Sequence, residues 1–433
     1  MSSDETYRSD SNRYTGSSTM TLRSPSRFGD EIYYGWVVVA ACFLGSLVVF
    51  GLSYSFGVFL DPMVDEFERS RSVTTIAFSV QMVVLSVGAV IVGILIDRYG
   101  NRPMLAVGGI LLCGGLVWAS QASSIATLIL AYGFVTGLGL SIIYVISYAT
   151  VPKWFDRRVG FASGVASTGL GVGMVVSAPA SNVLIERVGW RSSLLVLAGV
   201  AAALLMIMCA IIRDEPAADS VPSEEFKGDA ARSRSASLRK RLEIISSLAR
   251  TRSFRYVFAS WMLIYASLYI ILAHIVAHAT DLGLSRATGA ALIAIIGVTT
   301  ILGRVAIGFL ADRIDRTRVF AVCSALMGVS TLAVPILETK LSLFGFAIGF
   351  GLGYGGNGAL LGPLTADHFG RSNLNAVFGL VSASIGLSGL GAPYLAAVGY
   401  ETMASYAPAF AAAGIAAIAG AGLLLVVGEE RGS

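Results

Sequence analysis

Arg304 is an isolated charge in a run of apolar residues, 290–310, that is long enough to cross a lipid bilayer. A guanidinium at the middle of a membrane helix costs roughly 2.5 to 3.5 kcal/mol, so such residues usually face a polar cavity. The carboxylates of the chain fall at the ends of apolar segments, which leaves Arg304 without an acidic partner. We therefore expect an anionic substrate to be its partner. The alternative is a side chain that reaches the membrane surface near Asp312, about 12 Å further along the helix.

Two histidines, His274 and His278, lie one helical turn apart in another apolar segment, 255–279. An imidazole near neutral pH can carry a proton and contact a carboxylate, which makes His274 a candidate for substrate binding and for proton coupling. The alternative for His274 is a hydrogen bond between helices, and an interfacial position is favoured for His278. No third ligand accompanies the pair, so no metal site is expected.

Aromatic and amide side chains supply further candidates for a substrate site. Tyr144 and Tyr354, the latter with Asn357, stand in glycine-rich runs. Their polar groups can share a carboxylate while the tyrosine rings pack on a short aliphatic tail. Phe378 is a weaker candidate for the same wall. The alternative for each tyrosine is a position at the lipid interface.

The composition indicates a polytopic, all-α membrane protein. Of 433 residues, 55% are hydrophobic and only 13% are charged, against about 25% charged in ordinary soluble proteins. Apolar runs predict twelve membrane helices. They span approximately 34–60, 72–96, 104–120, 125–151, 159–185, 190–212, 255–279, 287–310, 319–337, 341–366, 375–398 and 403–427.

The loops predict the orientation of the chain. Of the 31 Lys and Arg residues, 24 fall on the side of both termini and 6 on the other side. The positive-inside rule therefore predicts cytoplasmic termini in a cell-membrane protein, and the net charge of +4 reflects these loops rather than nucleic-acid binding. The polar residues 1–33 read as a disordered tail, without the apolar core of a secretory signal.

Enzymatic and cofactor signatures are missing from the sequence. The four cysteines show no paired spacing, which argues against disulfides and a cysteine-ligated metal. The glycine runs lack the Gly-Lys-Ser/Thr ending of a phosphate-binding loop, so ATP-driven transport is excluded. No enzyme activity and no cofactor are expected.

An internal repeat divides the chain into two halves. GILIDRYGNR at 93–102 matches GFLADRIDRTR at 308–318, at an offset of 215 residues. We expect a six-helix half over 34–212, a polar cytoplasmic linker over 213–254, a second half over 255–427 and a short tail over 428–433.

The repeated motif resembles the loop signature of the major facilitator superfamily, which implies the fold of that family. The resemblance assigns a conformational latch at the cytoplasmic surface to the motif residues. Breakable charge networks at helix ends suit two halves that rock against each other. The motif residues in this sequence are Gly93, Asp97, Arg98, Arg102, Gly308, Asp312 and Arg313.

A second motif narrows the resemblance. KWFDRRVGFASGVASTG at 153–169 is similar to the signature of the monocarboxylate transporters, and prokaryotic oxalate/formate antiporters share most of it. In both groups the eighth helix carries a substrate-binding arginine, which Arg304 followed by Gly308 matches. A guanidinium suits a carboxylate because its fixed fork of donors can hold both oxygens.

Three departures qualify the resemblance. The oxalate carriers place a lysine in the eleventh helix where this sequence has Ile385. A single cation indicates a single carboxylate. Animal monocarboxylate carriers have an aspartate and a lysine where this sequence has Thr300 and Val58, so their proton relay does not transfer unchanged.

The sequence therefore predicts a proton-coupled carrier of small monocarboxylates, lactate or pyruvate by preference, that works by alternating access. Its partners are the carboxylate, protons and the lipid bilayer. The alternatives are an antiporter of the oxalate/formate type, a receptor on a carrier scaffold that does not transport, and drug efflux, which the incomplete antiporter motif around residues 169–181 disfavours.

Overall fold

Long α-helices account for nearly all of the structure. The computed structural model describes residues 33–214, 246–371, 374–403 and 405–429, and no strand occurs within these ranges. The predicted tail up to residue 32 and most of the predicted linker lie outside the described residues.

The helices follow one another along two stretches of chain. The first stretch contains α1 (Tyr34–Phe67), α2 (Arg71–Tyr99), α3 (Asn101–Ser120), α4 (Ile125–Leu128), the π-helix η1 (Ile129–Val135), α5 (Thr136–Ala149), α6 (Val151–Trp154), α7 (Val159–Ser167) and α8 (Gly169–Ile211). The second stretch contains α11 (Arg252–Asp281), α12 (Arg286–Ala311), α13 (Arg316–Ala333), the 3₁₀ turn η3 (Val334–Ile336), α14 (Lys340–Phe369), α15 (Leu374–Met403) and α16 (Ala407–Glu429).

Within the described ranges, eleven segments are long and apolar enough to cross a membrane. One predicted span, 341–366, is not among them, although α14 covers it with 30 helical residues. Its glycine-rich centre and polar residues lower the hydropathy of α14, and the second half of this helix is almost wholly buried. A buried helix contacts other helices more than lipid, so small residues that allow close packing replace bulky apolar ones.

Local chemistry sets where the helices begin and end. The Ser70 hydroxyl accepts a hydrogen bond from the Val73 amide and so caps the start of α2. Gly100, with φ of 89°, ends α2 and turns the chain into α3. Gly189, with φ of 77°, is the one non-helical residue inside α8 and kinks this helix. A residue with a side chain would be strained at either glycine.

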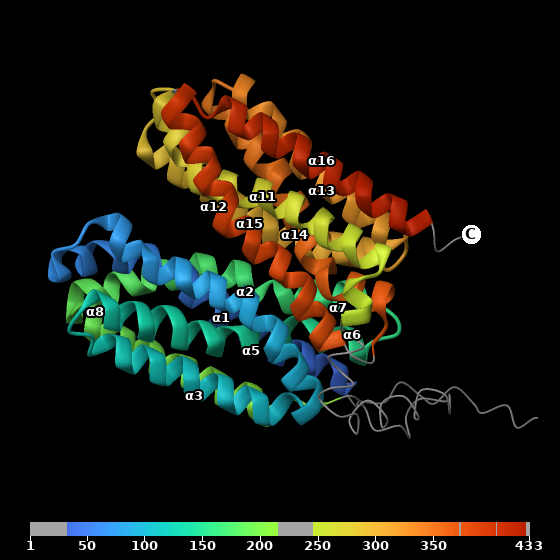
Figure 1. The fold of residues 1–433 in the computed structure, drawn as a ribbon, viewed down its shortest axis with the longest axis horizontal. Coiled ribbons are helices and arrows are strands. Elements are labelled where there is room, and N and C mark those ends of the chain that lie inside the picture. Colours follow the sequence, from blue (N-terminus) through green and yellow to red (C-terminus); the bar gives the residue numbers. More distant parts are fainter. Residues whose placement is uncertain (1–32, 215–245, 372–373, 404, 430–433) are drawn as a thin grey trace, which may run out of the picture. The chain divides into compact units, whose positions relative to one another are not determined.

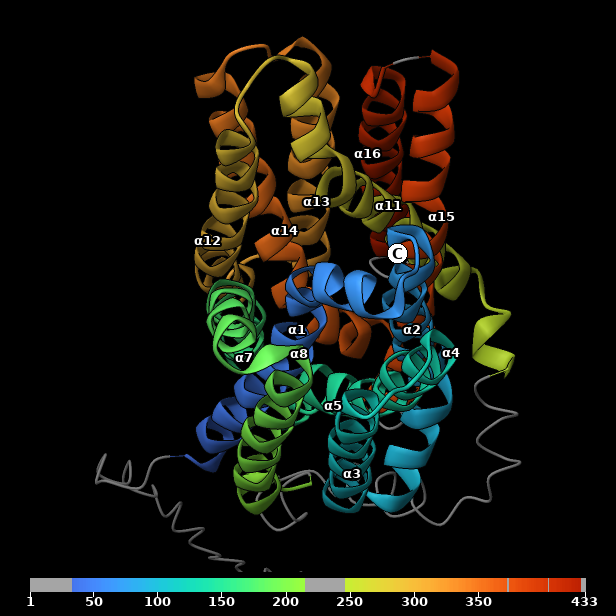
Figure 2. The same ribbon diagram turned by 90° about the vertical axis from the view of Figure 1, so that its left-hand side faces the viewer.

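The helices of each stretch pack mainly on one another, and the two largest contacts between the stretches are equivalent to each other. In Figure 1 the first stretch is coloured blue to green and the second yellow to red. α1 packs on α8 and α3 on α5, while α12 packs on α14 and α11 on α16. The joining contacts are α2 with α15 and α7 with α12, which Figure 2 shows. The repeat offset of 215 residues relates these two contacts to each other.

Candidate substrate site

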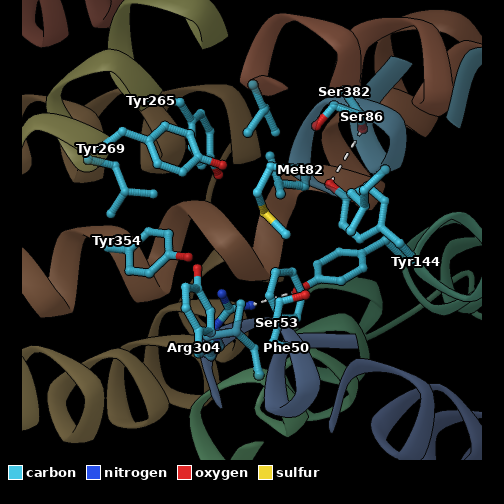
Figure 3. A pocket seen from close by; sticks show the side chains of 17 residues that line it. Phe50, Ser53, Met82, Ser86, Tyr144, Tyr265, Tyr269, Arg304, Tyr354 and Ser382 are labelled. Atoms are coloured by element: carbon cyan, nitrogen blue, oxygen red, sulfur yellow. Dashed lines mark hydrogen bonds between the residues drawn. The ribbon is translucent and has the colours of Figure 1, made fainter. Parts of the chain in front are cut away.

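Arg304 lies in a cavity between the two stretches. The cavity has a volume of about 50 Å³. Its wall is formed by side chains of eight helices, α1, α2, α5, α8, α11, α12, α14 and α15, and Arg304 is the contribution of α12. Figure 3 shows the side chains converging from these helices. The lining residues are Phe50, Ser53, Tyr54, Met82, Leu85, Ser86, Tyr144, Tyr148, Leu170, Tyr265, Leu268, Tyr269, Arg304, Tyr354, Leu361, Ser382 and Ile385.

The guanidinium of Arg304 is buried, with 1% of the residue exposed. Its Nη1 lies 3.4 Å from the hydroxyl of Tyr148, and its Cζ lies 5.6 Å from the centre of the Tyr354 ring. Its Nε has no hydrogen-bond partner among the described residues. The described lining also contains no Asp or Glu. Arg304 is therefore a buried cation with no anionic partner among the described residues, and its burial contradicts the alternative of a side chain that reaches the membrane surface.

Glycines on neighbouring helices make room for this arginine. A Cβ atom on Gly358 of α14 would lie 2.5 Å from Cζ of Arg304. On the other side, Gly164 of α7 packs against the backbone carbonyl of Arg304. Both approaches exclude a side chain, so these positions fix where α12 can place the guanidinium.

Tyrosines form most of the polar wall. The Tyr144 hydroxyl lies 3.5 Å from that of Ser382, and the Tyr144 ring packs at 5.0 Å from Tyr148. Tyr265 is buried, and its hydroxyl has no partner among the described residues. Figure 3 shows the Tyr265, Tyr269 and Tyr354 hydroxyls directed into the same space as the guanidinium. These hydroxyls can donate to an anion that Arg304 holds.

Tyr144 and Tyr354, which the sequence analysis names as candidates, line this cavity, while other residues of the wall were not among its candidates. Tyr148 follows Tyr144 by one helical turn, and Tyr265 and Tyr269 have the same spacing on α11. That spacing puts each pair on one helix face, which is the signal that could have found them. Ile385, at the expected position of a second cation, also lines the cavity.

Two other predicted residues lie behind the wall. Phe378 is fully buried, and its ring packs on Tyr144 at 5.5 Å and on Tyr148 at 6.0 Å. The Asn357 amide donates to Ser324 at 3.1 Å and thereby joins α14 to α13. Neither is among the residues lining the cavity.

The structure does not bring His274 to the guanidinium. Its Nε2 lies 3.0 Å from the carbonyl oxygen of Pro393 on α15, and its ring stacks on Tyr406 at 4.8 Å. This is the hydrogen bond between helices that the sequence left open as the alternative. The rings of His278 and Phe410 pack edge to face, with their centres 5.2 Å apart.

Thr300, where animal monocarboxylate carriers have an aspartate, donates a hydrogen bond from its hydroxyl to the Gly351 carbonyl at 3.2 Å.

The two aspartates of the repeated motif make equivalent contacts at the end of the molecule where α1 begins. Asp97 of α2 accepts hydrogen bonds from Asn375 Nδ2 at 2.8 Å and from the Ala376 amide at 3.0 Å, in the first turn of α15. Asp312 accepts from the Gly160 amide at 2.7 Å and the Phe161 amide at 2.8 Å, in the first turn of α7. A carboxylate at a helix N-terminus accepts hydrogen bonds from the free backbone amides there, and its negative charge interacts favourably with the helix dipole.

The motif glycines bring these helices together. Gly93 of α2 lies against the backbone of Asn375, and Gly308 of α12 lies against the backbone of Gly160, so that a Cβ at either motif glycine would overlap backbone atoms. Each glycine precedes its aspartate by one helical turn.

The motif arginines make contacts within their own stretch of helices. Arg102 donates to the carbonyl oxygens of Ile212 and Ala210, which ties α3 to the end of α8. The Arg98 and Arg313 guanidiniums lie over neighbouring aromatic rings, at 5.1 Å from Tyr99 and 4.3 Å from Phe309.

The two stretches form two packed sets of membrane-crossing helices, joined by equivalent contacts around a buried polar cavity, which is the architecture of secondary carriers. A sequence model of the Major Facilitator Superfamily matches residues 42–303 and 257–433. The chain belongs to the Major Facilitator Superfamily, as its repeated motif predicted. It is therefore a secondary transporter and not an enzyme.

Named relatives are monocarboxylate transporters. The chain is 29% identical over 398 residues to monocarboxylate transporter 13 of Bos taurus, with 91% of this chain and 89% of the relative covered. It is 27% identical over 412 residues to monocarboxylate transporter 2 of Rattus norvegicus, with 91% and 83% covered.

Solved structures share the fold. The proton:xylose symporter XylE bound to 6-bromo-6-deoxy-D-glucose matches with a TM-score of 0.69 at 14% identity, over 91% of this chain and 95% of the other. The transporter FucP in the outward conformation matches with a TM-score of 0.68 at 13% identity, over 92% and 99%. At these identities the likeness concerns the fold alone.

Proposed function

We propose that this transporter carries a small monocarboxylate of the lactate or pyruvate type, together with a proton, by alternating access. The observation that carries the proposal is the buried guanidinium of Arg304, which has a free Nε and no carboxylate in the described lining. A substrate carboxylate accepts hydrogen bonds from the guanidinium and from nearby tyrosine hydroxyls. The named relatives support the same substrate class.

The size and charge of the cavity favour one small anion. A volume of about 50 Å³ holds roughly three to five water molecules at about 10 to 15 Å³ each. Ile385 occupies the wall position at which the sequence comparison with oxalate carriers expects a second cation. A dianion would bury a second negative charge without a partner, which disfavours the oxalate/formate alternative.

The helix contacts support a latch role for the motif aspartates. Asp97 and Asp312 each hold the first turn of a helix from the other set, so both contacts must break for the sets to separate at this end. With cytoplasmic termini, as the loop charges indicate, the latch lies at the cytoplasmic face of the cell membrane. The conformation described here is then closed toward the cytoplasm.

Proton coupling has two candidate routes. In the first, His274 takes up the proton after a substrate anion has neutralised Arg304. In the second, the bound carboxylate itself carries the proton. The position of His274 outside the lining favours the second route in the present conformation.

Uptake into proteoliposomes tests the proposal. Labelled lactate, pyruvate, formate and oxalate are offered with and without an inward pH gradient. We expect accumulation of the three-carbon monoacids that depends on the gradient. Oxalate uptake that requires internal formate would establish the antiporter instead. Binding without uptake would indicate a receptor.

A further inference from the structure

A π-helix interrupts the membrane span that carries two tyrosines of the substrate site. The segment η1 lies between α4 and α5, within the apolar span Ile125–Trp154. At its end the Thr136 amide donates to the carbonyl oxygen of Ala131, five positions earlier, where an α-helix would use the carbonyl of Tyr132. We call this arrangement the π-register. Short π-segments inside α-helices are rare and frequently occur at functional sites.

The side chain of Gln81 on α2 binds the carbonyl group that the π-register leaves free. Its Nε2 donates to the carbonyl oxygen of Tyr132 at 3.3 Å and to Oγ1 of Thr136 at 2.8 Å. The Thr136 hydroxyl donates to the same carbonyl oxygen. Gln81 is 1% exposed and is not among the residues lining the Arg304 cavity. Its hydrogen bonds therefore act on a neighbouring helix and not on a ligand.

Glycines hold the π-segment close to its neighbours. A Cβ atom on Gly133 would lie 2.8 Å from the carbonyl oxygen of Ala77 on α2. On another side, a Cβ atom on Gly115 of α3 would lie 2.7 Å from Cγ2 of Thr136. The segment cannot turn about its axis without losing these close contacts, so its register is fixed by packing as well as by hydrogen bonds.

The π-register determines which face of α5 meets Arg304. An α-helix turns by about 100° per residue, so removing the extra residue of a π-turn rotates the following helix by about that angle relative to the preceding turn. Tyr144 and Tyr148 follow on α5, and both line the cavity. The Tyr148 hydroxyl accepts the hydrogen bond from Nη1 of Arg304 at 3.4 Å. A rotation of this size would carry both rings away from the guanidinium.

We propose that Gln81 is a positioning residue of the substrate site. By binding the free carbonyl of Tyr132 it stabilises the π-register, and this register directs the two tyrosines of α5 toward Arg304. The inference rests on the proposed function, because it takes Arg304 and the tyrosine hydroxyls as the groups that bind the substrate carboxylate. A glutamine that only joined two helices would stabilise the fold without acting on the tyrosines.

A double-mutant cycle with Tyr148→Phe separates these two roles. Gln81→Met removes the donor and keeps a side chain of similar length. We expect either change alone to weaken lactate binding to the purified protein by about tenfold. The combined variant should bind lactate within about twofold of Tyr148→Phe alone, because both changes remove the same hydroxyl from Arg304. Isothermal titration measures the affinities, with lactamide as the control for binding that does not involve the carboxylate.

Thr136→Val tests the same contact without changing α2. Valine has the shape of threonine but lacks the hydroxyl that accepts from Gln81. We expect lactate binding to weaken by about threefold, with no further loss when this change is combined with Gln81→Met. The matched control is Ser260→Ala, a fully buried position whose hydroxyl joins α11 to the Gly420 carbonyl of α16 at 2.7 Å. It should lower the Tm and leave lactate affinity within about twofold.

The outcomes separate this inference from the proposed function. Lactate affinity of Gln81→Met within about twofold of the native value would overturn the inference. A loss of equal size in native and Tyr148→Phe protein would also overturn it, since Gln81 would then act independently of the tyrosine. Both results leave the proposed function standing. Failure of lactate and pyruvate to bind the native protein would overturn the proposed function itself.

Discussion

At the scale of single residues, the electrostatics of Arg304 dominate the site. A buried guanidinium without a counter-charge is unfavourable, and polar hydroxyls only partly replace its lost hydration. In the proposed function, the substrate carboxylate supplies both the counter-charge and the hydrogen-bond acceptors, so its binding would remove this penalty. The affinity for the acid would then depend on the shape of the cation as well as on its charge.

Arg304→Lys keeps the charge and removes the planar fork. We expect binding of the preferred acid to weaken by roughly 10- to 100-fold, because a charged hydrogen bond contributes about 1.5 to 3 kcal/mol. Isothermal titration of the purified protein measures the change, with Arg255→Lys on an exposed position of α11 as the control. Affinity within about twofold of the native value would remove Arg304 from the site.

Gly358→Ala tests the placement of the guanidinium without touching its chemistry. The added methyl group overlaps Cζ of Arg304, so the side chain must move and acid binding is expected to fall by at least about tenfold. Gly345→Ala on the same helix is the matched control, because no atom lies within 4 Å of a Cβ there. Equal binding by the two variants would show that the guanidinium tolerates displacement.

At the scale of helices, three carboxylates bind the ends of neighbouring helices. Asp97 and Asp312 bind the first turns of α15 and α7, and Glu66 binds the turn at which α8 kinks. The contacts of Asp97 and Asp312 join helices from different sets, so breaking them would allow the two sets to separate. The third joins helices of one set, since Arg191 also donates to the carbonyl oxygens of Ser120 and Ala122 at the end of α3.

Asp312→Asn should loosen the contact of α12 with α7. Loss of the charge weakens two amide hydrogen bonds by about 1 to 2 kcal/mol in total, which shifts an opening equilibrium by about 5- to 30-fold. The reporter is Ile94→Cys, buried between α2 and α15, in a protein whose four native cysteines are replaced. Its rate of alkylation should rise accordingly.

Asp65→Asn, an exposed residue at the far end of α1, is the control for this experiment. An unchanged alkylation rate in Asp312→Asn would mean that the aspartate only caps α7 and does not hold the two sets together.

The lowered pKa of Glu66 predicts that the free energy of unfolding depends on pH. Partial burial alone would raise the pKa of this carboxyl, but hydrogen bonds from Arg191 and Trp190 and the charge of Arg191 outweigh it and lower the pKa below 4.5. The unfolded chain therefore binds a proton at higher pH than the folded chain does. The stabilisation is fully present above pH 4.5 and is lost as the pH falls through the lowered pKa.

Thermal unfolding of the native protein and of Glu66→Gln checks this expectation. The native protein should have the higher Tm near neutral pH, and the difference should shrink as the pH falls below about 4.5. A constant difference across the series would show that the charge of Glu66 does not contribute.

At the scale of the whole molecule, the sequence predicted the fold better than the site. The repeat of GILIDR and GFLADR predicted two equivalent halves, and its resemblance to the family's loop signature implied a latch that holds helices together. The position of Arg304 in a polar cavity was predictable because a charged side chain in an apolar membrane segment is unfavourable in contact with lipid.

The side of each helix that faces the cavity was harder to predict. His274 and Asn357 are polar, but their partners are Pro393 and Ser324, which no spacing in the sequence reveals. Tyr265 and Tyr269 were missed because tyrosines of membrane helices are also enriched at the lipid interface, so their type alone does not indicate a cavity. In helices buried on several sides, composition does not show which face is inward.

His274→Gln tests the coupling of the whole transport cycle. If His274 carries the proton, the variant should lose pH-driven accumulation more than exchange of substrate at equal pH. Both rates are measured in the same proteoliposomes, with His278→Gln as the comparison. Full accumulation by His274→Gln would assign this residue to the contact between α11 and α15, and the proton to the substrate.

Gly164 of α7 rests on the backbone carbonyl of the same residue whose guanidinium faces the cavity. If Arg304 holds the substrate as proposed, one residue belongs both to the ligand site and to the contact between the two sets. A conformational change that alters this contact would then alter the affinity for the substrate, and by thermodynamic linkage the substrate would shift the populations of the two conformations by the same factor. Selection for tighter binding and selection for faster turnover would then act on one amino acid.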